Sequence, residues 1–272
     1  MGDAETVDFK AITEIQQRTW SEGDFARVGA LIVPVAEQLA VSANVRAGDR
    51  VLDVACGAGN GAIAAARRSW EPVIGLDYVP ALLERARERA AAERLELELV
   101  EGDAQDLPFD DGSFDVVMSI FGAMFAPDQQ RTADELVRVC RPGGTIAMAN
   151  WVPDGFIGET FKAVAKHAPP PPGMPPPVLW GTEERLGELF GDRVSSLEVT
   201  RRKFGQSFRS PDHMLEVFRT YFGPTIVAFE RVGADGAEAL AADLHEVMER
   251  FNVDDRTFIA PSEYLEVIAV RA

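Results

Sequence analysis

Two residue types are scarce in this chain, and each scarcity narrows the class of protein. The 272 residues include only two cysteines, Cys56 and Cys140, and three histidines, His167, His213 and His245. Two cysteines cannot build a disulfide scaffold, and their small number indicates a reducing compartment. No group of cysteines and histidines has the spacing of zinc ligands, so we expect no metal site.

Positive charge and long apolar runs are also in short supply. Lys and Arg number 27 against 44 Asp and Glu, which gives a net charge of -17. Phosphate backbones and anionic membrane surfaces repel such a chain, which argues against nucleic acid as a partner. No apolar run comes near the roughly 20 residues that span a bilayer, and the acidic residues 1–5 lack the apolar core of a signal peptide. We therefore predict a cytoplasmic protein without a membrane span.

The remaining composition is that of a globular protein. Apolar residues make up 46% and charged residues 26% of the chain, which is long enough to bury a substantial core. Residues 5–44 have helical spacing, and Pro34 is expected to break or restart the second helix. Residues 50–151 alternate short apolar runs with amphipathic stretches, which predicts βαβ units and a parallel sheet.

The character of the apolar runs predicts their order in the sheet. The runs at 51–55, 114–120 and 145–151 are apolar throughout, as strands covered on both faces are. Residues 95–99 alternate leucine with glutamate, which is typical of an edge strand. This favours the order 3-2-1-4-5, and we expect residues 194–208 and 264–270 to add an antiparallel pair. The proline-rich residues 169–177 predict a stiff lid or connector, with a docking peptide as the less favoured alternative.

Three consecutive strand ends carry residues suited to ligand binding. The first strand runs into the glycine-rich loop Asp53–Gly61, where a ligand can approach main-chain N–H groups. Asp77 ends the second strand, and its two oxygens suit the hydroxyls of a ribose. Asp103 and Ala104 follow the third strand, where a carboxylate and an N–H could read the edge of an adenine. Taken singly, each motif could be a structural turn or helix cap, but the strand ends share one edge of the sheet.

These residues form part of an ordered set of five blocks. The blocks read VLDVACGAG at 51–59, GLD at 75–77, EGDAQDLPF at 101–109, GSFDVV at 112–117 and LVRVCRPGG at 136–144. Together they resemble the class I S-adenosylmethionine-dependent methyltransferases, and among these the small-molecule "type 11" or UbiE-like branch. The close resemblance covers residues 45–151.

The resemblance implies an α/β, doubly wound, Rossmann-like fold with a helical cap. The implied sheet has seven strands in the order 3-2-1-4-5-7-6, with the last strand antiparallel. We predict one methyltransferase domain over residues 1–272. Its parts would be a helical cap at 1–44, a cofactor-binding core at 45–152, a lid or connector at 153–181, the rest of the sheet at 182–206 and 261–272, and a cap insertion at 207–260.

The resemblance also implies S-adenosylmethionine as cofactor, with S-adenosylhomocysteine as product, and it assigns roles by position. One departure from the family pattern is Ala55, which stands where the family has a glycine. The predicted cofactor-binding residues are Trp20, Asp53, Ala55, Gly57, Gly59, Asp77, Tyr78, Asp103, Ala104 and Ser119.

The acceptor is predicted to be a small hydrophobic or aromatic molecule, methylated on oxygen, nitrogen or carbon. Aromatic and apolar side chains over the carboxyl edge suit such a molecule, although each could simply pack in the core. His167 is the candidate general base because it lies after the fifth strand. The predicted substrate-binding residues are Phe121, Met124, Phe125, Trp151, Trp180 and Tyr221.

Other functions remain open from the sequence alone. Residues 119–122 read SIFG where nucleobase methyltransferases of this fold carry an Asn/Asp-Pro-Pro-aromatic motif, which argues against a DNA or RNA substrate. A nicotinamide-dependent oxidoreductase would share the glycine loop and Asp77, but it leaves residues 101–104 unexplained. A non-catalytic binding protein on the same fold is the other alternative. The sequence does not determine which atom of the acceptor is methylated or whether the protein forms a homodimer.

Overall fold

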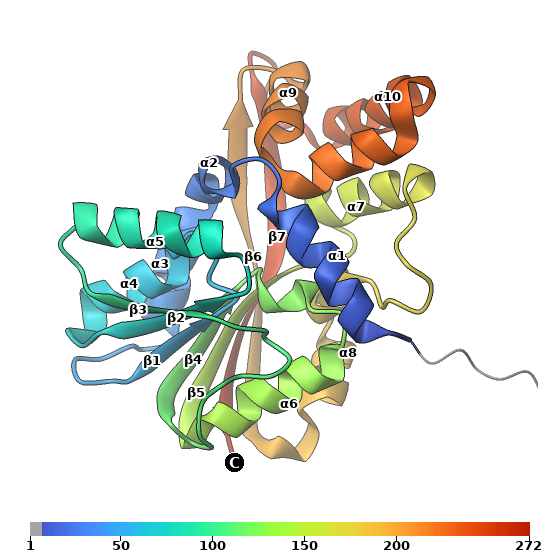
Figure 1. Cartoon of the computed structure of the whole chain (residues 1–272). Helices are drawn as coiled ribbons and strands as arrows, with labels where there is room; N and C mark the ends of the chain where they lie inside the picture. Colours follow the sequence, from blue (N-terminus) through green and yellow to red (C-terminus); the bar gives the residue numbers. More distant parts are fainter. Residues whose placement is uncertain (1–6) are drawn as a thin grey trace, which may run out of the picture.

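A single seven-stranded sheet organises the computed structural model, which describes residues 7–272 (Figure 1). Its order, β3-β2-β1-β4-β5-β7-β6, confirms the prediction. The first five strands in chain order pair in parallel, and β7 pairs antiparallel with both β5 and β6. The strands are β1 (Val51–Val54), β2 (Val73–Asp77), β3 (Leu97–Glu101), β4 (Phe114–Ile120), β5 (Cys140–Trp151), β6 (Val194–Phe208) and β7 (Phe258–Arg271).

The burial of each strand follows its place in the sheet. All four residues of β1 are buried, and β4 is buried at five of its seven positions, because helices cover both of their faces. In contrast, β3 has no fully buried residue, which agrees with its predicted place at the edge. The carboxyl ends of β1, β2 and β4 therefore meet at one well-packed edge of the sheet.

Helices cover both faces of the sheet and rise above its carboxyl edge (Figure 1). α3 and α4 pack against each other and on the central strands, and α5 packs on β2 and β3, whereas α6 and α8 pack together near β4 and β5. α7, α9 and α10 form a cap, which α1 contacts. The helices are α1 (Phe9–Ser21), α2 (Phe25–Gly29), α3 (Val33–Ser42), α4 (Asn60–Ser69), α5 (Pro80–Ala92), α6 (Gln129–Val139), α7 (Phe156–His167), α8 (Glu183–Phe190), α9 (Pro211–Tyr221) and α10 (Gly223–Phe251).

One segment of the described chain, Phe25–Ser42, is long and apolar enough to cross a membrane by length and composition. Core helices of globular proteins meet the same criterion, so this segment does not contradict the predicted absence of a membrane span. The segment is divided into α2, the 3₁₀ turn η1 (Ala30–Ile32) and α3, with Pro34 in the first turn of α3. Its side chains Leu39 and Ala40 are fully buried in the core of this fold.

One boundary differs from the sequence-based expectation. The strand β5 begins at Cys140, directly after α6, whereas the apolar run in the sequence begins at residue 145. Cys140 already pairs with Phe114, and a register shift then admits the turn with Gly143 at φ +70°. After the prolines, residues Pro177–Gly181 form the 3₁₀ turn η3. The division of the chain into domain parts stays a prediction.

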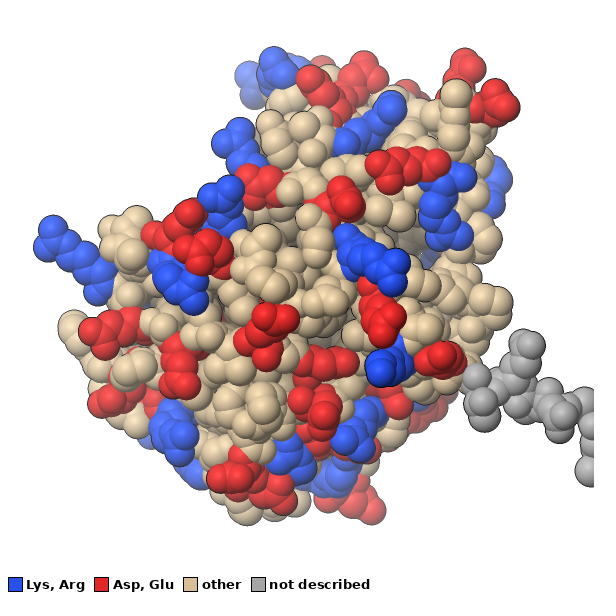
Figure 2. Space-filling model, viewed as in Figure 1, with Lys and Arg blue, Asp and Glu red and all other residues tan. Residues whose placement is uncertain are grey.

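Charges of both signs are interspersed over the face shown in Figure 2, and an uncharged stretch lies near its middle. Many of the charges form local pairs, such as Arg85 with Glu88 on α5. Because exposed pairs of this kind stabilise a fold by at most about 1 kcal/mol, they contribute mainly to solvation of the surface. The excess of negative charge over the whole chain is therefore not gathered in one patch on this face.

Candidate active site

The turn from β1 into α4 depends on three glycines, two in the loop and one, Gly61, in the first turn of α4. Gly57 and Gly59 have φ of +53° and +82°, a backbone region that favours glycine. A Cβ atom at Gly59 would lie 2.9 Å from the Cβ of Ala86. At Gly61, a Cβ would lie 2.3 Å from Cδ1 of Ile120 and 2.7 Å from Oδ2 of Asp53. The loop thus brings β1, α4 and β4 closer together than side chains would allow.

Ala55 shows what the departure from the family pattern requires. Its φ is +53°, so an alanine adopts the left-handed backbone that glycine adopts without strain. The neighbouring backbone is also close, because a Cβ at Gly122 would lie 2.2 Å from the carbonyl oxygen of Ala55. The methyl group of Ala55 is accommodated in this turn, and the residue lines the cavity described below.

Two buried carboxylates hold the loop and face the same cavity. Oδ2 of Asp77 accepts the N–H of Gly57 at 2.8 Å, and Oδ1 accepts the N–H of Val79 at 2.9 Å. Oδ2 of Asp53 accepts the N–H of Ala62 at 2.7 Å, whereas Oδ1 is buried and has no partner among the described residues. Burial raises the pKa of Asp53 to about 7, with a further contribution from the charge of Asp77, and burial raises the pKa of Asp77 to about 6.

A cavity extends from these carboxylates into the helical cap. One end of the cavity lies at the ends of β1 and β2; we call it the cofactor end, because predicted cofactor-binding residues gather there. The far end lies between α7, β6, α9 and the start of α10. Among the described residues 7–272, the lining includes the two carboxylates but no lysine, arginine or histidine. Its aromatic members are Trp20, Phe25, Tyr78, Phe121, Phe125, Trp151, Phe161, Phe218 and Phe222.

Seven of the ten predicted cofactor-binding residues line this cavity. They are Trp20, Asp53, Ala55, Gly57, Asp77, Tyr78 and Ala104. The other three, Gly59, Asp103 and Ser119, do not line it. Gly59 has a structural role, since it gives the turn its left-handed conformation and packs against Ala86.

Ser119 was predicted to contact the methionine part of the cofactor, and the structure places it elsewhere. Its side chain is fully buried. The hydroxyl donates to the carbonyl oxygen of Val54 at 2.8 Å and accepts the N–H of Ala123 at 2.9 Å. Both functions of the hydroxyl are therefore used within the protein, and Ser119 joins β1 to β4 instead of facing the ligand cavity.

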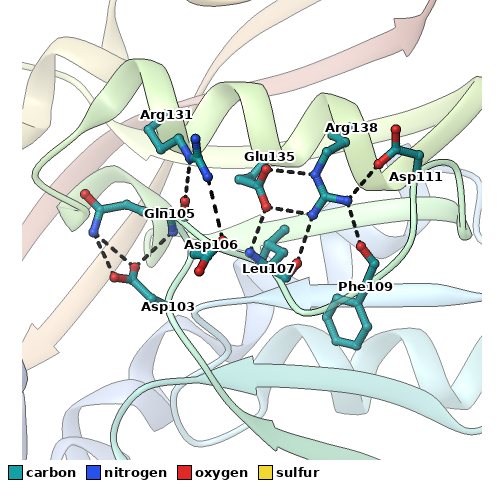
Figure 3. Close-up of polar contacts among 9 residues, drawn as sticks. All are labelled: Asp103, Gln105, Asp106, Leu107, Phe109, Asp111, Arg131, Glu135 and Arg138. Atoms are coloured by element: carbon teal, nitrogen blue, oxygen red, sulfur yellow. Dashed lines mark hydrogen bonds and ion pairs between the residues drawn. The ribbon is translucent and has the colours of Figure 1, made fainter.

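Asp103 is held by its own loop (Figure 3). Its carboxylate accepts the N–H of Gln105 at 2.9 Å and the side-chain amide of Gln105 at 3.0 and 3.1 Å. That amide also donates to Thr13 on α1 at 3.0 Å. In this conformation the carboxylate of Asp103 lies outside the cavity and is paired within its own loop, so its contact with an adenine stays a prediction.

The same loop is fastened to α6, as Figure 3 shows. Glu135 accepts the N–H of Leu107 at 2.7 Å and pairs with Arg138 at 2.7 Å. Burial acts to raise the pKa of Glu135, but the hydrogen bonds from Arg138 and Leu107 lower it overall. Arg138 also donates to the carbonyl oxygens of Leu107 and Phe109. These bonds fix the loop that carries Ala104 to the edge of the cavity.

Three of the six predicted substrate-binding residues line the cavity, namely Phe121, Phe125 and Trp151. The rings of Phe121 and Trp151 stack with centroids 3.6 Å apart. Met124 and Trp180 are fully buried in the core and do not reach the cavity.

Tyr221 also lies outside the cavity lining, where the guanidinium of Arg27 sits 5.3 Å from its ring centroid. The structure therefore does not bring Met124, Trp180 and Tyr221 to the cavity, because the first two pack in the core and the third packs against Arg27.

Several cavity residues carry no sequence signal that marks them. Phe25, Phe161 and Phe218 belong to amphipathic helices, where a cavity-facing residue looks like a core residue. Phe222 also lines the cavity, and its ring centroid lies 5.6 Å from that of Trp20. Gln206 lies on β6, and the alternation of that strand marks it only as inward-facing.

His167 is not brought to the cavity. It ends α7, and its Nε2 lies 2.7 Å from Oδ2 of Asp243 on α10. The other histidines are also engaged elsewhere, because His245 contacts Asp212 at 2.8 Å and His213 accepts the N–H of Arg209 at 3.3 Å. The structure therefore contradicts the expectation that His167 faces the acceptor as a general base.

Comparison with known proteins agrees with this geometry. A family model described as "Methyltransferase domain" matches residues 52–148. An uncharacterised protein of Mycobacterium tuberculosis (strain H37Rv) is 41% identical over 247 residues, which cover 90% of this chain and 89% of that protein. A demethylmenaquinone methyltransferase of Deinococcus radiodurans is 38% identical over 124 residues, 44% of this chain and 52% of that enzyme.

A solved structure shows the same fold. The geranyl diphosphate C-methyltransferase of Streptomyces coelicolor, crystallised with Mg²⁺, geranyl diphosphate and S-adenosylhomocysteine, superposes with a TM-score of 0.53 at 18% identity. The alignment covers 88% of this chain and 77% of that one. The fold and cavity thus define a Rossmann-like enzyme that uses S-adenosylmethionine. The chain belongs to the S-adenosylmethionine-dependent methyltransferases, in the family whose domain model matches residues 52–148.

The cofactor end of the cavity fits this methyl donor. Oδ1 of Asp53 is a buried acceptor without a partner among the described residues, and it lies beside a glycine loop that leaves room for a ligand. Both acidic groups of the lining are gathered at this end, which suits a ligand that carries positive charge. The residues present are therefore compatible with S-adenosylmethionine.

Proposed function

We propose that this methyltransferase acts on a small, uncharged molecule with a hydrophobic or aromatic body, in the cytoplasm. The observation that carries the proposal is the make-up of the cavity beyond the cofactor end. Aromatic and aliphatic side chains dominate there, and within the part of the chain that the structure describes no lysine, arginine or histidine lines any part of the cavity. An acceptor with a phosphate or carboxylate would enter without a cationic partner, which makes its desolvation costly.

The charges and the backbone groups at the cofactor end indicate which residues bind each part of S-adenosylmethionine. S-adenosylmethionine supplies a methyl group activated by a positive sulfonium when bound. We assign the ribose to Asp77, which keeps lone pairs free beside its two backbone bonds, and the positive groups of the donor to Asp53. Tyr78 and Ala104 would border the adenine, and Ala55 and Gly57 would border the methionine part.

The protein's own contribution to methyl transfer is then mainly positioning. Phe121, stacked on Trp151, forms one wall next to the cofactor end, and Phe125 and Trp20 form an aromatic contact with ring centroids 5.0 Å apart. Holding two reactants in line can lower a barrier by roughly 7–11 kcal/mol in well-oriented systems. A cavity lined mostly by apolar groups also excludes water, which strengthens the remaining electrostatic interactions.

The test is methyl transfer to matched acceptors. Purified protein is incubated with methyl-labelled S-adenosylmethionine and a panel of neutral phenols, aromatic amines and the corresponding aromatic carboxylates. We expect label in neutral aromatic acceptors and none in the carboxylates. Transfer confined to charged acceptors would overturn the proposed acceptor class.

A binding control separates the remaining alternatives. Calorimetry should detect the binding of S-adenosylhomocysteine but no binding of NADH. The matching family model and the named relative are methyltransferases and give no support to a nicotinamide-dependent oxidoreductase. Binding of S-adenosylhomocysteine without transfer to any acceptor in a broad panel would instead favour the non-catalytic alternative.

A further inference from the structure

One polar side chain in the apolar part of the cavity has no partner. Gln206 lines the cavity from β6, and its side chain is 5% exposed. Its Oε1 atom is buried and accepts no hydrogen bond, and among residues 7–272 its amide makes none. A buried amide in this state is unfavourable unless a ligand completes it.

Apolar residues flank Gln206 on its own strand and opposite it on β7, where the nearest polar side chain in register is the buried Ser262. Its neighbours on the same face of β6 are Phe204 and Phe208, and it pairs across the sheet with Ala260. The ring of Phe204 lies 5.9 Å from that of Trp151, and the ring of Phe208 lies 6.1 Å from that of Phe218. An apolar residue would suit this face better.

The position of Gln206 along the cavity separates it from the methyl donor. The acids assigned to the donor lie at the ends of β1 and β2, whereas β6 is the strand at the opposite edge of the sheet. Thr160 and Thr225 also line this region. The hydroxyl of Thr160 already donates to the carbonyl oxygen of Phe156 at 2.8 Å, so its donor is used within α7.

We propose that Gln206 is a specificity-determining residue, and that its Oε1 accepts a hydrogen bond from a hydroxyl on the aromatic body of the methyl acceptor. This inference rests on the proposed function and deepens it, because it adds one polar group to an otherwise apolar acceptor. This hydrogen bond offsets the free-energy cost of desolvating the hydroxyl of the acceptor. A methyl ether at the same place has no hydrogen to donate.

The test compares two probes on the protein saturated with S-adenosylhomocysteine. Calorimetry or tryptophan fluorescence gives the affinities for 2-naphthol and for 2-methoxynaphthalene. We expect the parent protein to prefer 2-naphthol by about five- to tenfold, the size of one neutral hydrogen bond. Gln206→Leu should reduce this ratio to about one, chiefly by weakening 2-naphthol.

Ser207→Val is the matched control, because Ser207 is the next residue on β6 and its side chain is exposed on the opposite face. It should keep the ratio of the parent protein. Gln206→Met serves as a second variant of similar length, and both Gln206 variants should bind S-adenosylhomocysteine as the parent does. That measurement shows that each variant is folded.

The outcomes are distinguishable. If the parent fails to bind S-adenosylhomocysteine, the proposed function itself is wrong. If it binds S-adenosylhomocysteine but does not prefer 2-naphthol, or if Gln206→Leu and Gln206→Met keep the preference, the role of Gln206 is overturned.

Discussion

The main-chain N–H of Gly57 donates to Oδ2 of Asp77 at 2.8 Å, and this bond ties the loop after β1 to the end of β2. The other oxygen of the same carboxylate accepts the N–H of Val79. One side chain thus fixes both turns that form the cofactor end of the cavity, before any ligand is present. The stability of the loop and the affinity for the donor should therefore change together at this position.

Replacing Asp77 with alanine should weaken the binding of S-adenosylhomocysteine by at least about tenfold, since charge-assisted hydrogen bonds contribute about 1.5–3 kcal/mol each. The variant should also unfold at lower urea concentration, because two buried N–H groups lose their acceptor. Calorimetry and urea unfolding measure the two effects. Asp106→Ala, at an exposed acid of the next loop, is the control and should change neither.

Asp103→Ala provides a sharper comparison. Its carboxylate lies outside the cavity and is paired with Gln105, so we expect less than about a threefold loss of affinity. A loss as large as that of Asp77→Ala would show that Asp103 turns toward the adenine when the donor binds. That result would confirm the prediction made from the sequence.

Asp53→Asn should stabilise the ligand-free protein while it weakens donor binding. Burial raises the pKa of Asp53 to about 7, so folding opposes its charge, and a neutral amide removes this cost while its oxygen can still accept the N–H of Ala62. We expect a gain of about 1–3 kcal/mol in the free energy of unfolding at pH 8, from the usual cost of a shifted buried acid. Lower stability together with unchanged affinity for S-adenosylmethionine would contradict this role.

The affinity for S-adenosylmethionine should fall as the pH is lowered from 8 to 5. The raised pKa values of about 7 for Asp53 and about 6 for Asp77 mean that both carboxyls take up protons in this range. In the ligand-free protein the same shifts favour folding at low pH, and this contribution is lost as the pH rises through about 7. The increase in melting temperature caused by the donor should therefore be largest above pH 7, and a flat profile would exclude these acids as its partners.

His167→Gln should leave the turnover of any accepted substrate within about twofold of the parent. The imidazole contacts Asp243 and does not line the cavity, so its removal affects the contact between α7 and α10. Initial rates with labelled donor, together with thermal unfolding, test this expectation. A large fall in turnover at unchanged stability and donor affinity would return His167 to a catalytic role.

Ala55→Gly should keep donor affinity within about threefold, because glycine adopts the positive φ of this position without strain. Ala55→Val should lose most of that affinity, since a β-branched residue is strongly disfavoured at φ +53° and its extra methyl groups would enter the cavity. Calorimetry with S-adenosylhomocysteine measures both variants. Equal affinities would mean that the backbone at this turn does not contact the donor.

The fold and the cofactor end were predictable because they depend on local patterns. The alternation of apolar runs and amphipathic stretches predicted the strands, and the alternating glutamates of residues 95–99 placed β3 at the edge. Asp53 and Asp77 lie at the carboxyl ends of β1 and β2, and Gly57 follows β1, so the sequence places all three at one edge of the sheet. Ser119 follows the same logic, but its hydroxyl finds backbone partners that no linear pattern shows.

The acceptor end was predicted only in part because it depends on how distant helices pack. Trp180 and Phe161 are both aromatic, yet Trp180, in the 3₁₀ turn η3, is fully buried, whereas Phe161, on α7, faces the cavity. The residue types are alike, and only the tertiary arrangement shows which of the two lines the cavity. Gln206 shows the opposite case, since a polar residue within an alternating strand carries no signal until its neighbours are known.

The hydroxyl of Ser119 bridges the last residue of β1 to the turn after β4, two residues from Phe121. The glycine loop proposed to bind the donor and the aromatic wall proposed to face the acceptor are thus linked through one hydroxyl. We expect this link to make the two segments move together, so that the protein scaffold sets the distance between donor and acceptor.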